Sequence, residues 1–126
     1  MHYKAKYNRP RPSRLSPRLM PLIEVPGHAS FPSGHSTQAH LVARCLEGVM
    51  PVEVAQPVAA PSGQEPGPLQ CLADRIARNR EVMGLHYPSD SRAGKILADE
   101  TFELLKECPT VKEMFKGAKS EWGRKD

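Results

Sequence analysis

The clearest structural signal in this 126-residue chain is the stretch SGHSTQAHLVARCLEGVMP, residues 33–51. Ser33 is a good helix N-cap, and Pro51 cannot continue a helix. Between them, apolar side chains recur at helical spacing, at Leu41, Val42, Cys45, Leu46 and Val49. These features predict a helix that begins at Gly34 and ends near Val49.

Two further helices of similar length are predicted downstream. Residues 69–83 carry an apolar stripe and precede Gly84, a residue type common just after a helix. Ser89 is a candidate cap for a helix over residues 89–107, and a short fourth helix is expected over residues 110–118. The side chains expected to face inward are Leu69, Leu72, Ile76 and Met83 in the first of these helices and Ala93, Ile96, Leu97, Leu104 and Leu105 in the second. No segment shows the alternation of polar and apolar residues that is typical of a strand. We therefore expect an all-α fold, a helical bundle of about four helices.

The length suits a single domain, residues 1–126, with long proline-rich connections. Prolines interrupt residues 9–32, which we expect to be largely irregular. Residues 51–68 contain five prolines and two glycines and predict a long surface loop. Residues 109–126, apart from the short fourth helix, are expected to form a C-terminal tail.

The positive charge of the chain is concentrated near its N-terminus. The net charge is +4, and residues 1–20 hold six cationic side chains, with no acidic residue before Glu24. The six are Lys4, Lys6, Arg9, Arg11, Arg14 and Arg18. Such a basic arm is compatible with binding of a small anion, with binding of a nucleic acid, or with simple solvation.

The cysteines and the apolar content give an expectation about the compartment. Cys45, Cys71 and Cys108 are far apart and follow no metal or disulfide spacing, so free thiols in a reducing compartment are expected. No apolar run is long enough to span a bilayer, and the N-terminus lacks the apolar stretch of a signal peptide. The cytoplasm is the default expectation, and the periplasm is the alternative if an upstream segment has been lost.

Two segments carry residues suited to binding phosphate. In KAKYNRPRP, residues 4–12, the cations of Lys4 and Arg11 can converge on one anion. In SFPSGH, residues 30–35, a serine hydroxyl and an uncrowded glycine N–H would lie at a helix N-terminus, which attracts anions. Each segment also has an ordinary explanation, namely solvated basic residues in the first and a common serine cap in the second.

A third segment, REVMGLHYPSD over residues 80–90, contains a histidine and a carboxylate four residues apart. Asp90 can fold back toward His86, fix the tautomer of its ring and make the other ring nitrogen a better nucleophile. The structural alternative is a carboxylate that caps the start of a helix, with the histidine packed nearby.

Together the three segments resemble the signature of the type 2 phosphatidic acid phosphatase superfamily, which includes bacterial acid phosphatases and vanadium-dependent haloperoxidases. Its pattern is Lys-x6-Arg-Pro, then Pro-Ser-Gly-His, then Ser-Arg-x5-His-x3-Asp. The chain matches it, in order and in spacing, at Lys4, Arg11-Pro12, Pro32 to His35, Arg80, His86 and Asp90. Asn79 departs from the pattern where many members have serine. The resemblance covers residues 4–100.

The resemblance implies a phosphomonoester hydrolase that acts on a small phosphorylated substrate and needs no cofactor. His86 would attack phosphorus and form a phosphohistidine, with Asp90 orienting its ring. His35 would protonate the leaving group and then activate water. The phosphate oxygens would be bound by Lys4, Arg11, Ser33, Gly34 and Arg80.

Three alternatives stay open. The first is a vanadium-dependent haloperoxidase, in which vanadate occupies the same site with His86 as its ligand; His28 is a possible accessory proton donor in that branch, or else a nearby loop residue. The second is a non-enzymatic nucleic-acid-binding domain that uses the basic arm. The third is a zinc site at His28, His35 and His86, whose spacing follows no common zinc framework.

The family's bundle normally has several helices before its first motif, and this chain has none there. A bundle of this size would be marginal by itself. We therefore expect either a missing N-terminal segment or a homo-oligomer that covers the apolar stripes.

Overall fold

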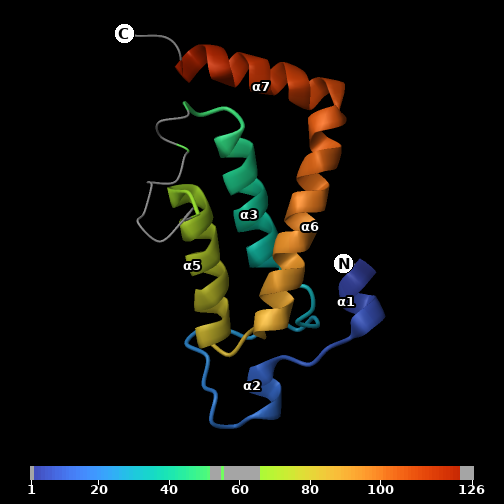
Figure 1. Ribbon diagram of the computed structural model, residues 1–126. Helices are drawn as coiled ribbons and strands as arrows, with labels where there is room; N and C mark the ends of the chain where they lie inside the picture. The colour runs from blue at the N-terminus through green and yellow to red at the C-terminus, as the bar shows by residue number, and fades with distance from the viewer. Residues whose placement is uncertain (1, 52–54, 56–65, 123–126) are drawn as a thin grey trace.

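The computed structural model describes residues 2–51, 55 and 66–122, and every regular element in these ranges is an α-helix (Figure 1). The all-α prediction is therefore confirmed. The helices are α1 (His2–Tyr7), α2 (Pro12–Leu15), α3 (Gly34–Glu47), α5 (Pro68–Val82), α6 (Pro88–Glu107) and α7 (Pro109–Trp122). None of them is long and apolar enough to cross a membrane.

The predicted count of about four helices is too low, because α1 and α2 add to the four longer ones. Most of the predicted loop over residues 51–68 lies outside the described residues, and α5 begins at Pro68. The predicted tail is wrong in part: α7 continues to Trp122, well beyond the short helix expected there. The centres of the Phe115 ring in α7 and the Phe102 ring in α6 are 6.4 Å apart, so these two rings contribute to the packing of α7 against α6.

Helices α3, α5 and α6 lie side by side, and α7 crosses one end of them (Figure 1). The chain runs along α3 and α6 in the same direction and along α5 in the opposite one. The N-termini of α3 and α6 and the C-terminus of α5 therefore meet at the end away from α7. The segments that contain α1 and α2 lie at this same end.

The interface of the three long helices is built from small residues. The buried apolar side chains are those of Ala43, Ala73, Ala77, Leu85 and Ala98. Several larger residues that were predicted to face inward point outward instead, namely Val42, Leu72, Ile96 and Leu104, each more than half exposed. Alanines allow helix backbones to approach closely. The buried face of each long helix is therefore narrower than the apolar stripe predicted from the sequence.

An apolar groove of about 340 Å³ lies between α3 and α5. Its walls include Val42 and Leu46 from α3 and Leu72 and Ile76 from α5. His35 lies at its edge, in the first turn of α3. The groove therefore joins the polar end of the bundle to an exposed apolar surface.

Candidate active site

A tight turn between α5 and α6 brings the third sequence segment to the polar end of the bundle. Gly84 follows α5 with φ +70°, a left-handed conformation that glycine adopts without strain. The backbone N–H groups of Leu85 and His86 then both donate to the carbonyl of Arg80, at 3.1 and 3.3 Å. The turn at the predicted stop Gly84 therefore holds the backbone of His86 against the last turn of α5.

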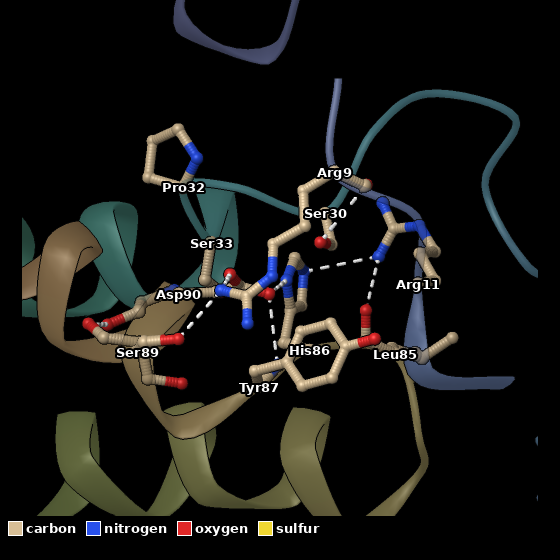
Figure 2. Close-up of polar contacts among 12 residues, drawn as sticks. Arg9, Arg11, Ser30, Pro32, Ser33, Leu85, His86, Tyr87, Ser89 and Asp90 are labelled. Carbon is tan, nitrogen blue, oxygen red and sulfur yellow. Dashed lines mark hydrogen bonds and ion pairs between the residues drawn. The ribbon is translucent and has the colours of Figure 1, made fainter. Parts of the chain in front are cut away.

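His86 is buried, with 4% of its surface exposed, and both of its ring nitrogens have partners (Figure 2). Its Nδ1 lies 3.3 Å from Oδ2 of Asp90, and its Nε2 lies 3.3 Å from Nη1 of Arg11. Because a guanidinium can only donate, Nε2 must be the acceptor and Nδ1 must carry the proton. The contacts therefore select the tautomer whose lone pair is on Nε2.

The Asp90 carboxylate is fully buried and uses both of its oxygens. Oδ2 accepts from His86 and from the backbone N–H of Tyr87 at 2.9 Å, whereas Oδ1 accepts from Nη1 of Arg9 at 2.8 Å. Burial by itself would raise the pKa of Asp90. The hydrogen bonds from His86 and Tyr87 and the charge of Arg9 outweigh this effect and lower it, so Asp90 is held as a carboxylate.

Asp90 makes both contacts that its position in the sequence predicts, one with the His86 ring and one with the backbone at the start of a helix. Helix α6 begins at Pro88, with Tyr87 at the N-cap position, so the prediction of a Ser89 cap is wrong. Proline is well suited to the first helical position because no N–H is needed there. Asp90 occupies the third position, where its carboxylate satisfies the Tyr87 N–H and holds His86 at the same time.

Arg11 lies at the centre of the cluster, only 2% exposed. Nη1 donates to the carbonyl of Leu85 at 2.9 Å, and Nε donates to the carbonyl of His28 at 3.2 Å. Burial and the nearby charge of Arg80 lower the pKa of Arg11, with the negative charge of Asp90 acting against them. The first and third sequence segments are therefore in direct contact.

Arg80, in the last turn of α5, has no hydrogen bond or ion pair through its guanidinium within the described residues, and its Nε is buried without a partner. A buried donor without an acceptor is costly, and an anion would satisfy it. The positive charge of Arg80 also acts on His35. Burial lowers the pKa of His35, and the charges of Arg80, His86, Arg11 and Lys4 lower it further. Positive charge from α1, α5 and the segment before α2 therefore reaches the first turn of α3.

Lys4 lies at this end of the bundle, and its ammonium group is fully hydrogen-bonded to backbone carbonyls. Its Nζ donates to the backbone carbonyls of Ala29, Ser30 and Pro32, at 2.8, 3.2 and 2.9 Å. All three of its donors are thus used to hold the loop that leads into α3. Burial and the charge of Arg11 lower the pKa of Lys4.

Ser33 and Gly34 occupy the predicted N-terminus of α3. Ser33 is the N-cap, and its buried Oγ accepts from the backbone N–H of Ser36 at 3.3 Å. The Ser33 N–H donates to the carbonyl of Asp90 at 3.0 Å, which joins the second segment to the third. A side chain built at Gly34 would meet no atom within 4 Å, so the first turn of α3 faces open space.

His28 lies on the other side of Arg11 from His86. Its Nδ1 is 3.1 Å from Nη2 of Arg11, and its ring is exposed. It therefore adjoins the cluster without contacting His86 directly. Within the described residues, no three histidine, cysteine or acidic side chains are grouped as metal ligands would be.

No known family model and no curated protein matches this chain. The likeness to the phosphatase and haloperoxidase superfamily thus depends on the three segments, and the structure brings residues of all three to one end of the bundle.

The sequence interpretation missed Arg9 as a member of the cluster. Arg9 binds Asp90 and Ser89, and its guanidinium lies 3.9 Å from the centre of the Tyr87 ring (Figure 2). A signal was available: Arg9 and Arg11 are two apart in a proline-flanked segment, and alternate residues of an extended backbone point to the same side.

Proposed function

We propose that the chain belongs to the type 2 phosphatidic acid phosphatase superfamily and hydrolyses phosphate monoesters through a phosphohistidine at His86. The observation that carries this proposal is the environment of the His86 ring. Asp90 holds Nδ1–H on one side, so the lone pair of Nε2 faces the guanidinium of Arg11. This is the arrangement of an activated nucleophile next to a binding group for an anion.

The arginines support a phosphate group as the bound anion. Arg80 has a buried donor without a partner, Arg11 is buried beside His86, and the charges of both lower the pKa of His35. The N-termini of α3 and α6 point to this end of the bundle, and their dipoles favour negative charge. The excess of cations is unfavourable without an anion, because like charges repel.

In the first chemical step, the Nε2 lone pair of His86 forms a bond to phosphorus while the ester P–O bond breaks. Arg11 exchanges its contact with Nε2 for a phosphate oxygen. The leaving oxygen takes a proton from His35, which is then neutral. The ring of His86 acquires positive charge, and the Asp90 carboxylate stabilises that charge.

In the second step, water replaces the histidine. His35 removes a proton from the water molecule as its oxygen attacks phosphorus. The P–N bond breaks, the electron pair returns to Nε2, and inorganic phosphate leaves. His35 is again protonated, so the cycle consumes one ester and one water and releases one alcohol and one phosphate.

The test is hydrolysis of p-nitrophenyl phosphate between mildly acidic and neutral pH, with and without orthovanadate. The expected result is turnover that orthovanadate suppresses and that His86→Ala abolishes. His2→Ala, at an exposed histidine of α1, is the matched control and should keep the activity. Quenching the working enzyme in alkaline denaturant should trap a phosphate label on the protein, and this label should be stable in base and lost on acidification.

The alternatives give different results in the same experiment. Binding of vanadate through His86, with no ester hydrolysis but with bromide oxidation by peroxide, would identify a haloperoxidase. Neither turnover nor vanadate binding would refute both enzymatic proposals. Lys4, Arg9 and Arg11 of the basic arm already form intramolecular hydrogen bonds, which favours the enzymatic proposals over nucleic-acid binding.

A further inference from the structure

We propose that Arg9 is a positioning residue for the His86–Asp90 pair, in addition to the groups that the sequence segments supply. The inference is drawn from the contacts of Arg9, and its expected effects on kcat and KM rest on the proposed function. Arg9 contacts Asp90 on the oxygen that His86 does not use. The two side chains therefore hold the carboxylate from opposite sides.

The carboxylate of Asp90 has no freedom to rotate in this arrangement. Oδ1 accepts from Nη1 of Arg9 at 2.8 Å, while Oδ2 accepts from both Tyr87 N–H and His86 Nδ1–H. Rotation about the terminal bond of Asp90 would break all of these contacts together. The orientation of the His86 ring, and hence of Nε2, depends on this carboxylate.

Arg9 is itself held in place by two further contacts. The same Nη1 donates to Oγ of Ser89 at 2.7 Å. The guanidinium carbon lies 3.9 Å from the centre of the Tyr87 ring, a distance suited to a cation–π contact. The two anchoring residues, Tyr87 and Ser89, both lie between His86 and Asp90, so Arg9 binds this turn as well as the carboxylate (Figure 2).

Charge gives a second reason for the role of Arg9. Asp90 is fully buried, and a buried carboxylate without a cation is strongly unfavourable. The imidazole of His86 cannot provide this cation in the resting state, because its Nε2 accepts a hydrogen bond and the ring is neutral. Arg9 is the cation in contact with the carboxylate, at a position where its own side chain is about one-third exposed.

The charged and titratable groups near His86 come from every neighbouring element. They are Lys4 of α1, Arg9 and Arg11 of the following segment, His35 of α3, Arg80 of α5 and Asp90 of α6. Among them, Arg9 contacts Asp90 and forms no hydrogen bond to His86. It therefore acts on the nucleophile through the carboxylate, whereas Arg11 and Arg80 are placed to bind the anion.

This division of roles is tested with Arg9→Gln and Arg9→Lys in the whole chain. We expect Arg9→Gln to lower kcat about 10- to 100-fold through misorientation of the nucleophile, with KM changed less than threefold. Arg9→Lys, which restores one cation near Asp90, should recover part of kcat. Arg80→Gln should do the reverse and mainly raise KM. Arg18→Gln, at an exposed arginine of the same arm, is the control.

A measurement without catalysis separates this inference from the proposed function. In wild type, the hydrogen-bonded Nδ1–H proton of His86 should give a low-field NMR signal, which His86→Gln identifies by its loss. Arg9→Gln should shift or broaden this signal while the circular dichroism spectrum stays helical. A signal identical in Arg9→Gln and wild type would overturn the positioning role. A shifted signal in a protein without phosphatase activity would keep the positioning role and reject the proposed function.

If Arg9→Gln fails to fold, Tyr87→Leu provides the second variant. It removes the ring under the guanidinium but leaves the Tyr87 backbone N–H and the Arg9–Asp90 ion pair in place. We expect a smaller decrease of kcat in the same direction and a smaller shift of the His86 proton. An unchanged kcat and an unchanged proton signal in this folded variant would contradict the inference.

Discussion

A Cβ atom at Gly94 in α6 would lie 2.7 Å from the backbone carbonyl oxygen of Ser33, the N-cap of α3. It would also lie 2.8 Å from Cβ of Ser36. Beside this contact, Ser36 Oγ donates to the carbonyl of Ser91 at 2.8 Å. The two helices that carry the second and third sequence segments are therefore as close as their backbones permit, and this approach sets the distance between two walls of the site.

Gly94→Ala should lower the free energy of unfolding by about 1–3 kcal/mol, because the added methyl group meets a backbone atom that cannot rotate away. Urea denaturation measures the change. Gly117→Ala in α7 is the matched control: a Cβ there meets no atom within 4 Å, so the better helix former should raise stability by about 0.5–1 kcal/mol. Equal effects of the two substitutions would show that α3 and α6 are not in close contact.

Asp90→Asn should lower the rate of ester hydrolysis by about 100-fold or more. Both carboxylate oxygens accept from donors, so in either orientation the new amide NH2 must face a donor, which is Arg9 or His86. The rate with p-nitrophenyl phosphate is the measurement. Asp99→Asn, at an exposed ion pair with Arg44, should leave the rate within about twofold of wild type.

Arg80→Gln should raise the pKa of His35. Burial lowers this pKa, and the charge of Arg80 is the first of the charges that lower it further. Removal of that positive charge makes protonation of His35 easier. An NMR titration of the His35 ring protons gives the pKa directly. Arg78→Gln, at an exposed arginine of the same helix that pairs with Glu81, should leave the His35 titration unchanged; an equal shift in both variants would refute the proximity argument.

The free energy of unfolding should fall as the pH decreases from about 7. The pKa values of His35 and His86 are both lowered in the folded chain from an ordinary value of 6.5. As the pH decreases, the histidines of the unfolded chain therefore bind protons before those of the folded chain. Stability is lost as the pH falls from about 6.5 through the lowered pKa values of the folded state. Asp90, whose folded pKa lies below 3.8, adds a further loss at more acidic pH.

Urea denaturation at pH 7.5, 6 and 5 tests this dependence. His86→Gln should reduce the loss of stability between pH 7.5 and 5, because the variant has one titrating group fewer in that range. His2→Gln, at an exposed position, should not reduce it. Stability that rises toward pH 5 in the wild-type chain would contradict the lowered pKa values.

The amino-acid sequence by itself determined the helical class and the approximate limits of α3, α5 and α6. Helical periodicity, caps and prolines act over three or four residues, so they can be recognised without knowing the fold. Gly84 is a clear case, since its position after an apolar stripe was enough to predict the end of α5. The order and spacing of the three segments likewise pointed to His86 and Asp90.

Only the tertiary structure decided how those residues are used. Arg9 and Asp90 are 81 positions apart, and no local pattern links them. Lys4, expected at the anion, instead donates to three carbonyls 25 to 28 positions away. Val42 and Leu72 lie on predicted inner stripes but face outward, because the helices meet through alanines. Hydrogen bonds and packing between distant segments depend on where the chain brings them together, and periodicity along the sequence does not contain this information.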